Sequence, residues 1–254
     1  MKAIVVAIHG ILTRQTDASW PDRFDAWMYE QDPEVRVLKK EYRAGPWPVW
    51  NCLVKDRYLA AGLANELELF VPPGRRDLPP IWVVAHSNGA VIALLTMRRL
   101  IARGVWIGGL IFAGAACEGD VERNGVAGWV RGGRLGCAVA FCSREDWVLA
   151  GDARAVGTWP GRLLAWLWGR LIWPYGCLGR TGWVGVAREE GRLRTFWFAG
   201  GHGGYFAPGQ REATFQKIYG IIRRPMAGGE CGVSDAGAGD DTCQTSNKNP
   251  GRAS

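Results

Sequence analysis

One serine lies where a nucleophile could be held for attack. The apolar run Ile81–Ala85 predicts a strand, the run Ala90–Leu100 predicts a helix, and Ser87 stands at the apex of the turn between them. Such a turn exposes the serine hydroxyl and directs helix N-terminal N–H groups toward it. The residues two before and two after must be small, as Ala85 and Gly89 are. Ser87 is therefore the candidate nucleophile; the alternative is a serine that only caps the helix.

A histidine late in the chain could serve as the base. His202 lies within the glycine-rich segment Gly200–Gly204, after the last predicted strand and before the last predicted helix. An imidazole at that point could take the proton of the serine hydroxyl. Serine first and histidine last is the chain order of one class of nucleophile–acid–base triads. The alternative is an ordinary surface histidine.

The turn after the first predicted strand, His9-Gly10-Ile11, could bind a developing oxyanion. In that interpretation the backbone N–H groups of Ile11 and Asn88 face the oxyanion. His9 itself would be structural, with its ring bound to nearby backbone. The alternative is a turn without function.

The rest of the chain predicts the elements that would position these residues. Short apolar runs rich in β-branched residues alternate with helical patterns, and the runs are continuous, as is typical of strands covered on both faces. This predicts an α/β fold with a mostly parallel sheet of about six strands and helices on both faces, whose active site lies at the carboxyl ends of the strands. The expected strands are Ile4–Ile8, Val35–Lys39, Ile81–Ala85, Leu110–Ala113, Cys137–Phe141 and Thr195–Phe198, and the expected helices cover about 22–31, 50–70, 88–103 and 209–223.

Together these motifs resemble those of the α/β-hydrolase family, in particular its esterases and lipase-like members. The resemblance covers roughly residues 1–223 and rests on Ile8–Ile11, Ala85–Gly89 and Gly201–Gly203. The segment Cys142–Leu149 looks like the family's acid loop. The chain departs from the family pattern at Ala85, where a glycine is usual.

The resemblance implies that Asp146 accepts the N–H of His202, which fixes the tautomer of the ring and stabilises the imidazolium. Glu145, Asp152 and Asp120 also lie near predicted strand ends and stay open as alternatives. The interval of 56 residues between Asp146 and His202 is long for the family.

The resemblance also implies an activity. A Ser87–His202–Asp146 triad would hydrolyse a small hydrophobic carboxylic ester, apolar in its acyl or alcohol portion, through an acyl-enzyme, and no metal or organic cofactor is expected. Thioester hydrolysis and acyl transfer use the same machinery and remain alternatives. A non-catalytic binding protein with this fold is a further alternative.

A tryptophan-rich insertion accounts for the long interval between acid and base. Residues 153–188 carry five tryptophans, five arginines and no acidic residue. One hypothesis makes this insertion a lid or a wall of the acyl pocket, with Trp166 and Trp173 against a hydrophobic substrate. A second makes it a peripheral contact with a membrane or lipid interface, which tryptophan and arginine suit. The third is an extra helix packed on the domain.

The composition favours one domain, expected over residues 1–225, followed by a disordered tail over 226–254 that lacks aromatic residues. The net charge is +7, but the basic residues form no block, so nucleic acid is not an expected partner. The seven cysteines have no zinc-type spacing and favour reduced thiols in a cytoplasmic protein. The run Ala3–Ile8 is too short for a signal peptide, and no apolar run is long enough to span a bilayer.

Overall fold

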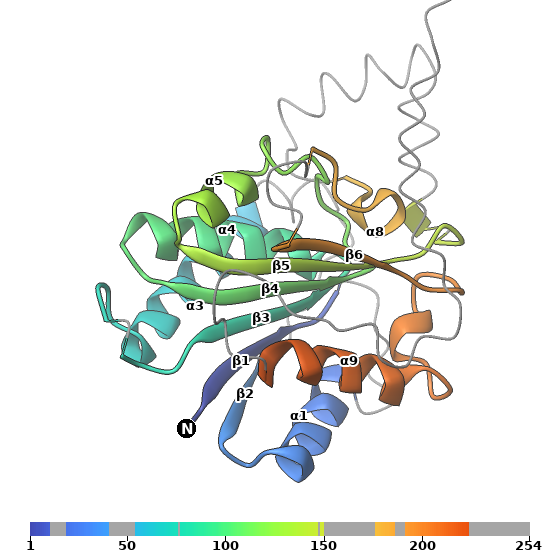
Figure 1. Cartoon of the computed structure of the whole chain (residues 1–254), viewed down its shortest axis with the longest axis horizontal. Coiled ribbons are helices and arrows are strands. Elements are labelled where there is room, and N and C mark those ends of the chain that lie inside the picture. The colour runs from blue at the N-terminus through green and yellow to red at the C-terminus, as the bar shows by residue number, and fades with distance from the viewer. Residues whose placement is uncertain are drawn as a thin grey trace, which may run out of the picture.

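Six strands form one sheet in the part of the chain that the structure describes. The structure is a computed structural model, and it describes residues 1–10, 19–40, 54–75, 77–146, 148–149, 176–185 and 191–223. The strand order is β2-β1-β3-β4-β5-β6, and all neighbouring strands are parallel (Figure 1). The strands are β1 (Ala3–Ile8), β2 (Val35–Lys40), β3 (Ile81–His86), β4 (Ile107–Ala113), β5 (Leu135–Cys142) and β6 (Leu193–Trp197). The predicted parallel sheet is confirmed.

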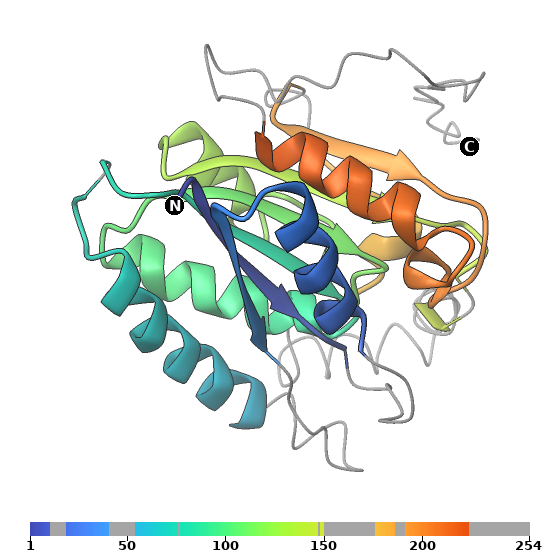
Figure 2. The same cartoon turned by 90° about the horizontal axis from the view of Figure 1, so that it is seen from below.

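Helices cover both faces of the sheet, as predicted. Helices α1 (Trp20–Gln31) and α9 (Arg211–Arg223) pack on one face, and α3 (Asp56–Phe70), α4 (Gly89–Ala102) and α5 (Val126–Arg131) pack on the other (Figure 2). Because side chains alternate along a strand, a strand between two helical layers must be apolar at every position. All six residues of β1 are buried accordingly.

The two edge strands depart from the expectation of strands covered on both faces. Most residues of β2 and β6 are partly or fully exposed, including Arg36 and Trp197. Each edge strand has a neighbouring strand on one side only, within the described residues. The side chains of β2 and β6 are therefore only partly covered by the rest of the protein and do not lie at the centre of the core.

The four predicted helices correspond to α1, α3, α4 and α9, and residues 50–53 of the second expected helix lie outside the described residues. The sequence does not predict the short helices α5, α8 (Leu178–Thr181) and η2 (Gly204–Phe206). None of the three is longer than 6 residues, so none shows a helical period.

Much of the predicted insertion and all of the predicted tail fall outside the described residues. Of residues 153–188, the structure describes 176–185, which include α8 next to β5 (Figure 1). The lid, the tail at 226–254 and the domain boundary at 225 stay predictions. In the described ranges, no helix combines the length and apolar character needed to cross a bilayer.

Candidate active site

Ser87 occupies a strained turn between β3 and α4. Its φ is +56°, and no other described non-glycine residue has a positive φ. The left-handed conformation costs an L-residue roughly 1–2 kcal/mol, so the surroundings must enforce it. The backbone N–H of Ser87 donates to the carbonyl of Ala113 at 3.2 Å, and the Ser87 carbonyl accepts from the N–H of Ala116 at 3.1 Å. Both bonds connect the turn to the chain leaving β4, which fixes the direction of the hydroxyl.

Two glycines make room for this turn. A Cβ atom at Gly89 would lie 2.8 Å from the carbonyl oxygen of Ile8 and 2.9 Å from that of His9. A Cβ atom at Gly10 would lie 2.6 Å from the Cβ of Ser87. The predicted need for a small residue at Gly89 is thus explained by the end of β1, which passes directly beside the turn. Gly10 is part of the motif His9-Gly10-Ile11 in the sequence, but only the structure shows that Gly10 lies close to Ser87.

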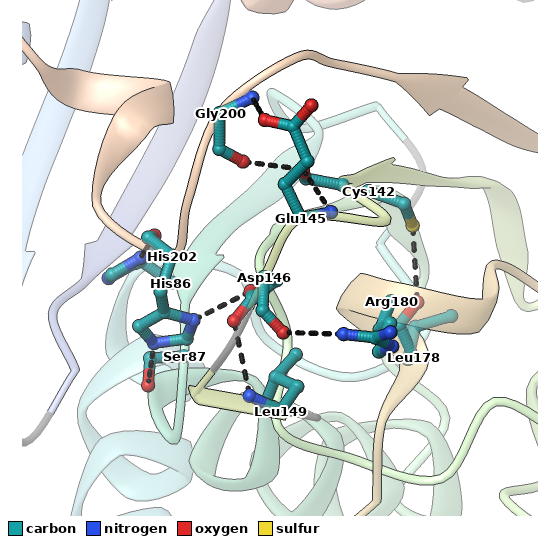
Figure 3. Close-up of polar contacts among 11 residues, drawn as sticks. His86, Ser87, Cys142, Glu145, Asp146, Leu149, Leu178, Arg180, Gly200 and His202 are labelled. Carbon is teal, nitrogen blue, oxygen red and sulfur yellow. Dashed lines mark hydrogen bonds and ion pairs between the residues drawn. The ribbon is translucent and has the colours of Figure 1, made fainter. Parts of the chain in front are cut away.

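His202 joins the serine to an aspartate (Figure 3). Its Nε2 lies 2.9 Å from Oγ of Ser87, and its Nδ1 lies 2.8 Å from Oδ2 of Asp146. With Asp146 ionised, its carboxylate can only accept, so Nδ1 carries the hydrogen and Nε2 is left to accept from the Ser87 hydroxyl. The structure therefore brings together all three residues that the sequence singled out, from the ends of β3, β5 and β6.

Asp146 is fully buried in the loop after β5. Its Oδ1 accepts the backbone N–H of Leu149 at 3.1 Å, and its own backbone carbonyl accepts Nη1 of Arg180 at 3.2 Å. A buried carboxylate needs hydrogen-bond donors to offset its loss of hydration, and here the N–H of Leu149 and the ring of His202 supply them. Together with the bond from Arg180, these bonds hold the carboxylate so that Oδ2 faces His202, and they come partly from α8, inside the predicted insertion.

The alternative acids have other partners. The carboxylate of Glu145 accepts the backbone N–H of Gly200 at 2.8 Å. The carboxylate of Asp120 accepts the backbone N–H groups of Glu122 and Arg123 within its own turn. Asp152 lies outside the described residues. Of the described candidates, only Asp146 is hydrogen-bonded to the histidine ring.

Hydrogen bonds from the acid loop also fix the loop that carries His202. The hydroxyl of Ser143 donates to the carbonyl of Gly200, and the Glu145 carboxylate accepts the N–H of the same glycine. Gly200 has a φ of +113°, which a residue with a side chain rarely adopts. Glu145 therefore stabilises the conformation of the loop that carries His202, a role that its position in the sequence did not indicate.

The predicted oxyanion turn is described only in part. Nδ1 of His9 donates to the carbonyl of Gly10 at 2.7 Å, so its ring is bound to nearby backbone as expected. The side chain of Asn88 donates to the buried carboxylate of Asp56, at 3.3 Å from Oδ2. Ile11 lies outside the described residues, so its part in an oxyanion site remains a prediction. The predicted substrate contacts of Trp166 and Trp173 remain predictions for the same reason.

His86 is a site residue that the sequence interpretation missed. Its Nε2 lies 3.0 Å from the backbone carbonyl oxygen of His202, and the two rings lie 5.0 Å apart (Figure 3). Burial, with the electrostatic effect of the neighbouring His202 second, lowers the pKa of His86 from 6.5 to about 3, so the ring is neutral in the folded protein at neutral pH. The sequence feature that could have indicated this role is the position of His86 directly before the candidate nucleophile. Among the described residues, no group of three His, Cys, Asp or Glu side chains could hold a metal ion.

No protein-family model matches the sequence, and no curated protein matches it. The chain is similar in structure to the NocB thioesterase domain, crystallised as a covalent complex with a fluorophosphonate nocardicin G analog, with 13% identity, coverage of 86% of this chain and 94% of that chain, and a TM-score of 0.47. It is similar to YbtT, a type II thioesterase from the yersiniabactin NRPS/PKS biosynthetic pathway, with 19% identity, 86% and 92% coverage and a TM-score of 0.43. Polyneuridine aldehyde esterase gives 12% identity, 86% and 100% coverage and a TM-score of 0.44. At such identities and TM-scores, no activity is carried over to this chain.

Proposed function

We propose that this chain, which has the α/β-hydrolase fold, is a serine hydrolase that cleaves carboxylic esters with an apolar acyl or alcohol portion. One observation carries the proposal: a serine held at φ +56° lies 2.9 Å from Nε2 of a histidine whose Nδ1 lies 2.8 Å from a fully buried aspartate. A nucleophile, a base and a group that orients the base are within hydrogen-bond reach of one another, as covalent catalysis by serine requires.

The first half of the reaction transfers the acyl group to the enzyme. His202 Nε2 takes the hydroxyl proton as Ser87 Oγ forms a bond to the ester carbonyl carbon. The buried carboxylate of Asp146 stabilises the imidazolium that results. The backbone N–H of Asn88, at the start of α4, and that of Ile11 are the proposed donors to the tetrahedral oxyanion. The intermediate then collapses, the bond to the alcohol oxygen breaks, and His202 returns its proton to that oxygen.

The second half repeats these steps with water. His202 takes a proton from a water molecule whose oxygen attacks the acyl-enzyme carbonyl, and the tetrahedral intermediate again forms opposite the same N–H groups. Its collapse releases the carboxylic acid and returns the proton to Ser87. Every step uses groups of this chain, the substrate and one water molecule.

Labelling with a fluorophosphonate probe tests the proposal directly, because the probe bonds covalently to activated serines. We expect the wild type to be labelled and Ser87→Ala to be unlabelled. Ser19→Ala is the matched control, since Ser19 donates to Asp22 at 2.7 Å at the start of α1 and belongs to no part of the site. It should be labelled like the wild type. A folded wild type that is neither labelled nor able to turn over any acyl substrate would overturn the proposal.

A substrate series then defines the class of ester. p-Nitrophenyl esters of increasing acyl length should show a rate that rises with chain length to an optimum, because the proposed acyl or alcohol portion is apolar. Thioesters with the same acyl groups, measured side by side, separate an esterase from a thioesterase. A kcat/KM that is consistently higher for the thioester would keep the serine mechanism and overturn the ester assignment.

A further inference from the structure

The side chain of His86 connects the strand that carries the nucleophile to the loop that carries the proposed base. Its Nε2 is 3.0 Å from the backbone carbonyl oxygen of His202 (Figure 3). A carbonyl oxygen only accepts hydrogen bonds, so the hydrogen must be on Nε2 of His86. This contact fixes both the tautomer of His86 and the position of the His202 backbone.

The loop that carries the base needs such a contact. Four of the five residues Gly200–Gly204 are glycines, and glycine loses more conformational freedom on ordering than any other residue. Ser143 and Glu145 hold the loop at Gly200, from the side of β5. His86 holds it from the side of β3, at the residue that carries the imidazole.

A neutral donor suits this position. The His86 ring lies 5.0 Å from the ring of His202, 6.3 Å from that of His9, 5.5 Å from that of Phe206 and 6.4 Å from that of Tyr205. Its Nδ1 is buried and has no hydrogen-bond partner in the described part of the chain, so a second proton there would be buried without an acceptor. With its low pKa, His86 adds no positive charge beside the imidazolium that His202 forms in the proposed reaction.

We propose that His86 is a positioning residue for the base: its Nε2–H fixes the backbone of His202 so that the imidazole stays within reach of Ser87. The inference rests on the proposed function. The bond from His202 Nδ1 to Asp146 holds the ring at one point, and a ring held at one point can still swing away from the serine. The bond from His86 fixes a second point, the main chain of the same residue.

Two substitutions of His86 by amide side chains of different length distinguish the positioning role from a role in packing alone. In His86→Gln the amide nitrogen is as many bonds from Cβ as Nε2 of histidine, so it can reach the carbonyl of His202. In His86→Asn it is one bond nearer the backbone, like Nδ1, and cannot. We expect His86→Asn to lower kcat by about tenfold to a hundredfold, as a misplaced catalytic group does, with little change in KM. His86→Gln should recover most of that loss at a similar melting temperature, and His86→Ala serves as the donor-free variant if His86→Asn does not fold.

The outcomes are distinguishable by the fluorophosphonate labelling rate, measured with kcat on the same samples. A folded wild type that is neither labelled nor able to turn over any acyl substrate overturns the proposed function and this inference with it. A wild type that is labelled, with glutamine and asparagine variants equally fast, overturns the positioning role alone. Equal losses of rate in both variants, matched by equal losses of melting temperature, would make His86 a packing residue and also overturn it.

Discussion

The substitution Gly114→Ala should lower both the stability of the protein and its kcat. The loss of stability should be larger than the cost of the strained backbone alone. Gly114 follows β4 directly and has a φ of +51°. A Cβ atom there would lie 2.9 Å from Cε2 of Tyr205, 3.4 Å from Nδ1 of His202 and 3.5 Å from Oδ2 of Asp146. In Gly114→Ala the new methyl group would therefore overlap the ring of Tyr205, next to the hydrogen bond between His202 and Asp146.

The magnitude has two parts. The left-handed conformation costs alanine roughly 1–2 kcal/mol of folding free energy. Overpacking against Tyr205, which is 1% exposed and so cannot move into solvent, adds about 1–3 kcal/mol. We expect a loss of about 2–5 kcal/mol in the free energy of unfolding. If the histidine moves by about 1 Å in response, kcat should fall on the order of 100-fold.

Gly133→Ala is the matched control, because Gly133 has a φ of +62° and no described atom within 4 Å of the Cβ position. It should lose only the backbone part and keep its activity. Urea unfolding followed by tryptophan fluorescence gives the stabilities, and ester hydrolysis gives kcat. Equal destabilisation of the two variants would refute the contact with Tyr205. Wild-type kcat in a destabilised Gly114→Ala would refute the link from that contact to His202.

Two further predictions concern the acid and the neutral histidine. Asp146→Asn should lower kcat by about 10⁴-fold without unfolding the protein, because an amide does not hold the required tautomer of the base; Asp120→Asn should keep full activity, and the reverse result would move the acid role to Asp120. The pKa of His86 is lowered from 6.5 to about 3 by burial, and secondly by the electrostatic effect of His202, so below pH 6.5 the unfolded chain binds a proton that the folded chain does not. Stability must then fall as the pH falls from 6.5 toward 3, and His86 alone should account for about 2 kcal/mol of unfolding free energy between pH 7 and pH 5. Urea unfolding at both values should show a smaller acid loss in His86→Gln than in the wild type; equal losses would mean that His86 titrates normally.

The turn at Ser87 could be predicted because its cause is local. A buried strand, a small residue two positions before and another two positions after the serine, and an apolar helix follow one another in the sequence, and each element shows its own pattern. The positions of His202 and Asp146 needed more, namely chain order and a resemblance to known hydrolases. The sheet topology explains why Ser87, His202 and Asp146 lie together, since parallel strands bring their carboxyl ends to one edge of the sheet.

The contacts of His86 and Glu145 could not be predicted in this way. His86 binds the backbone of a residue 116 positions later, and Glu145 binds the backbone of one 55 positions later. The acceptor or donor in each contact is a peptide group, which every residue possesses, so the partner's residue type gives no signal. Glu145 was an alternative for the acid because it lies near a predicted strand end, whereas its carboxylate accepts a hydrogen bond from the backbone N–H of Gly200.

The strand order also determines when the site can become functional during synthesis. β1 and β3 pair near the middle of the sheet, and β4, β5 and β6 are added outward in the order in which a ribosome produces them. A ribosome synthesises the chain from the N-terminus, at about 5–20 residues per second. A nascent chain that extends through the acid loop after β5 already contains Ser87 and Asp146 but not His202, which follows β6. The nucleophile is therefore made without its base, and the proposed acyl transfer can begin only after the last strand has docked.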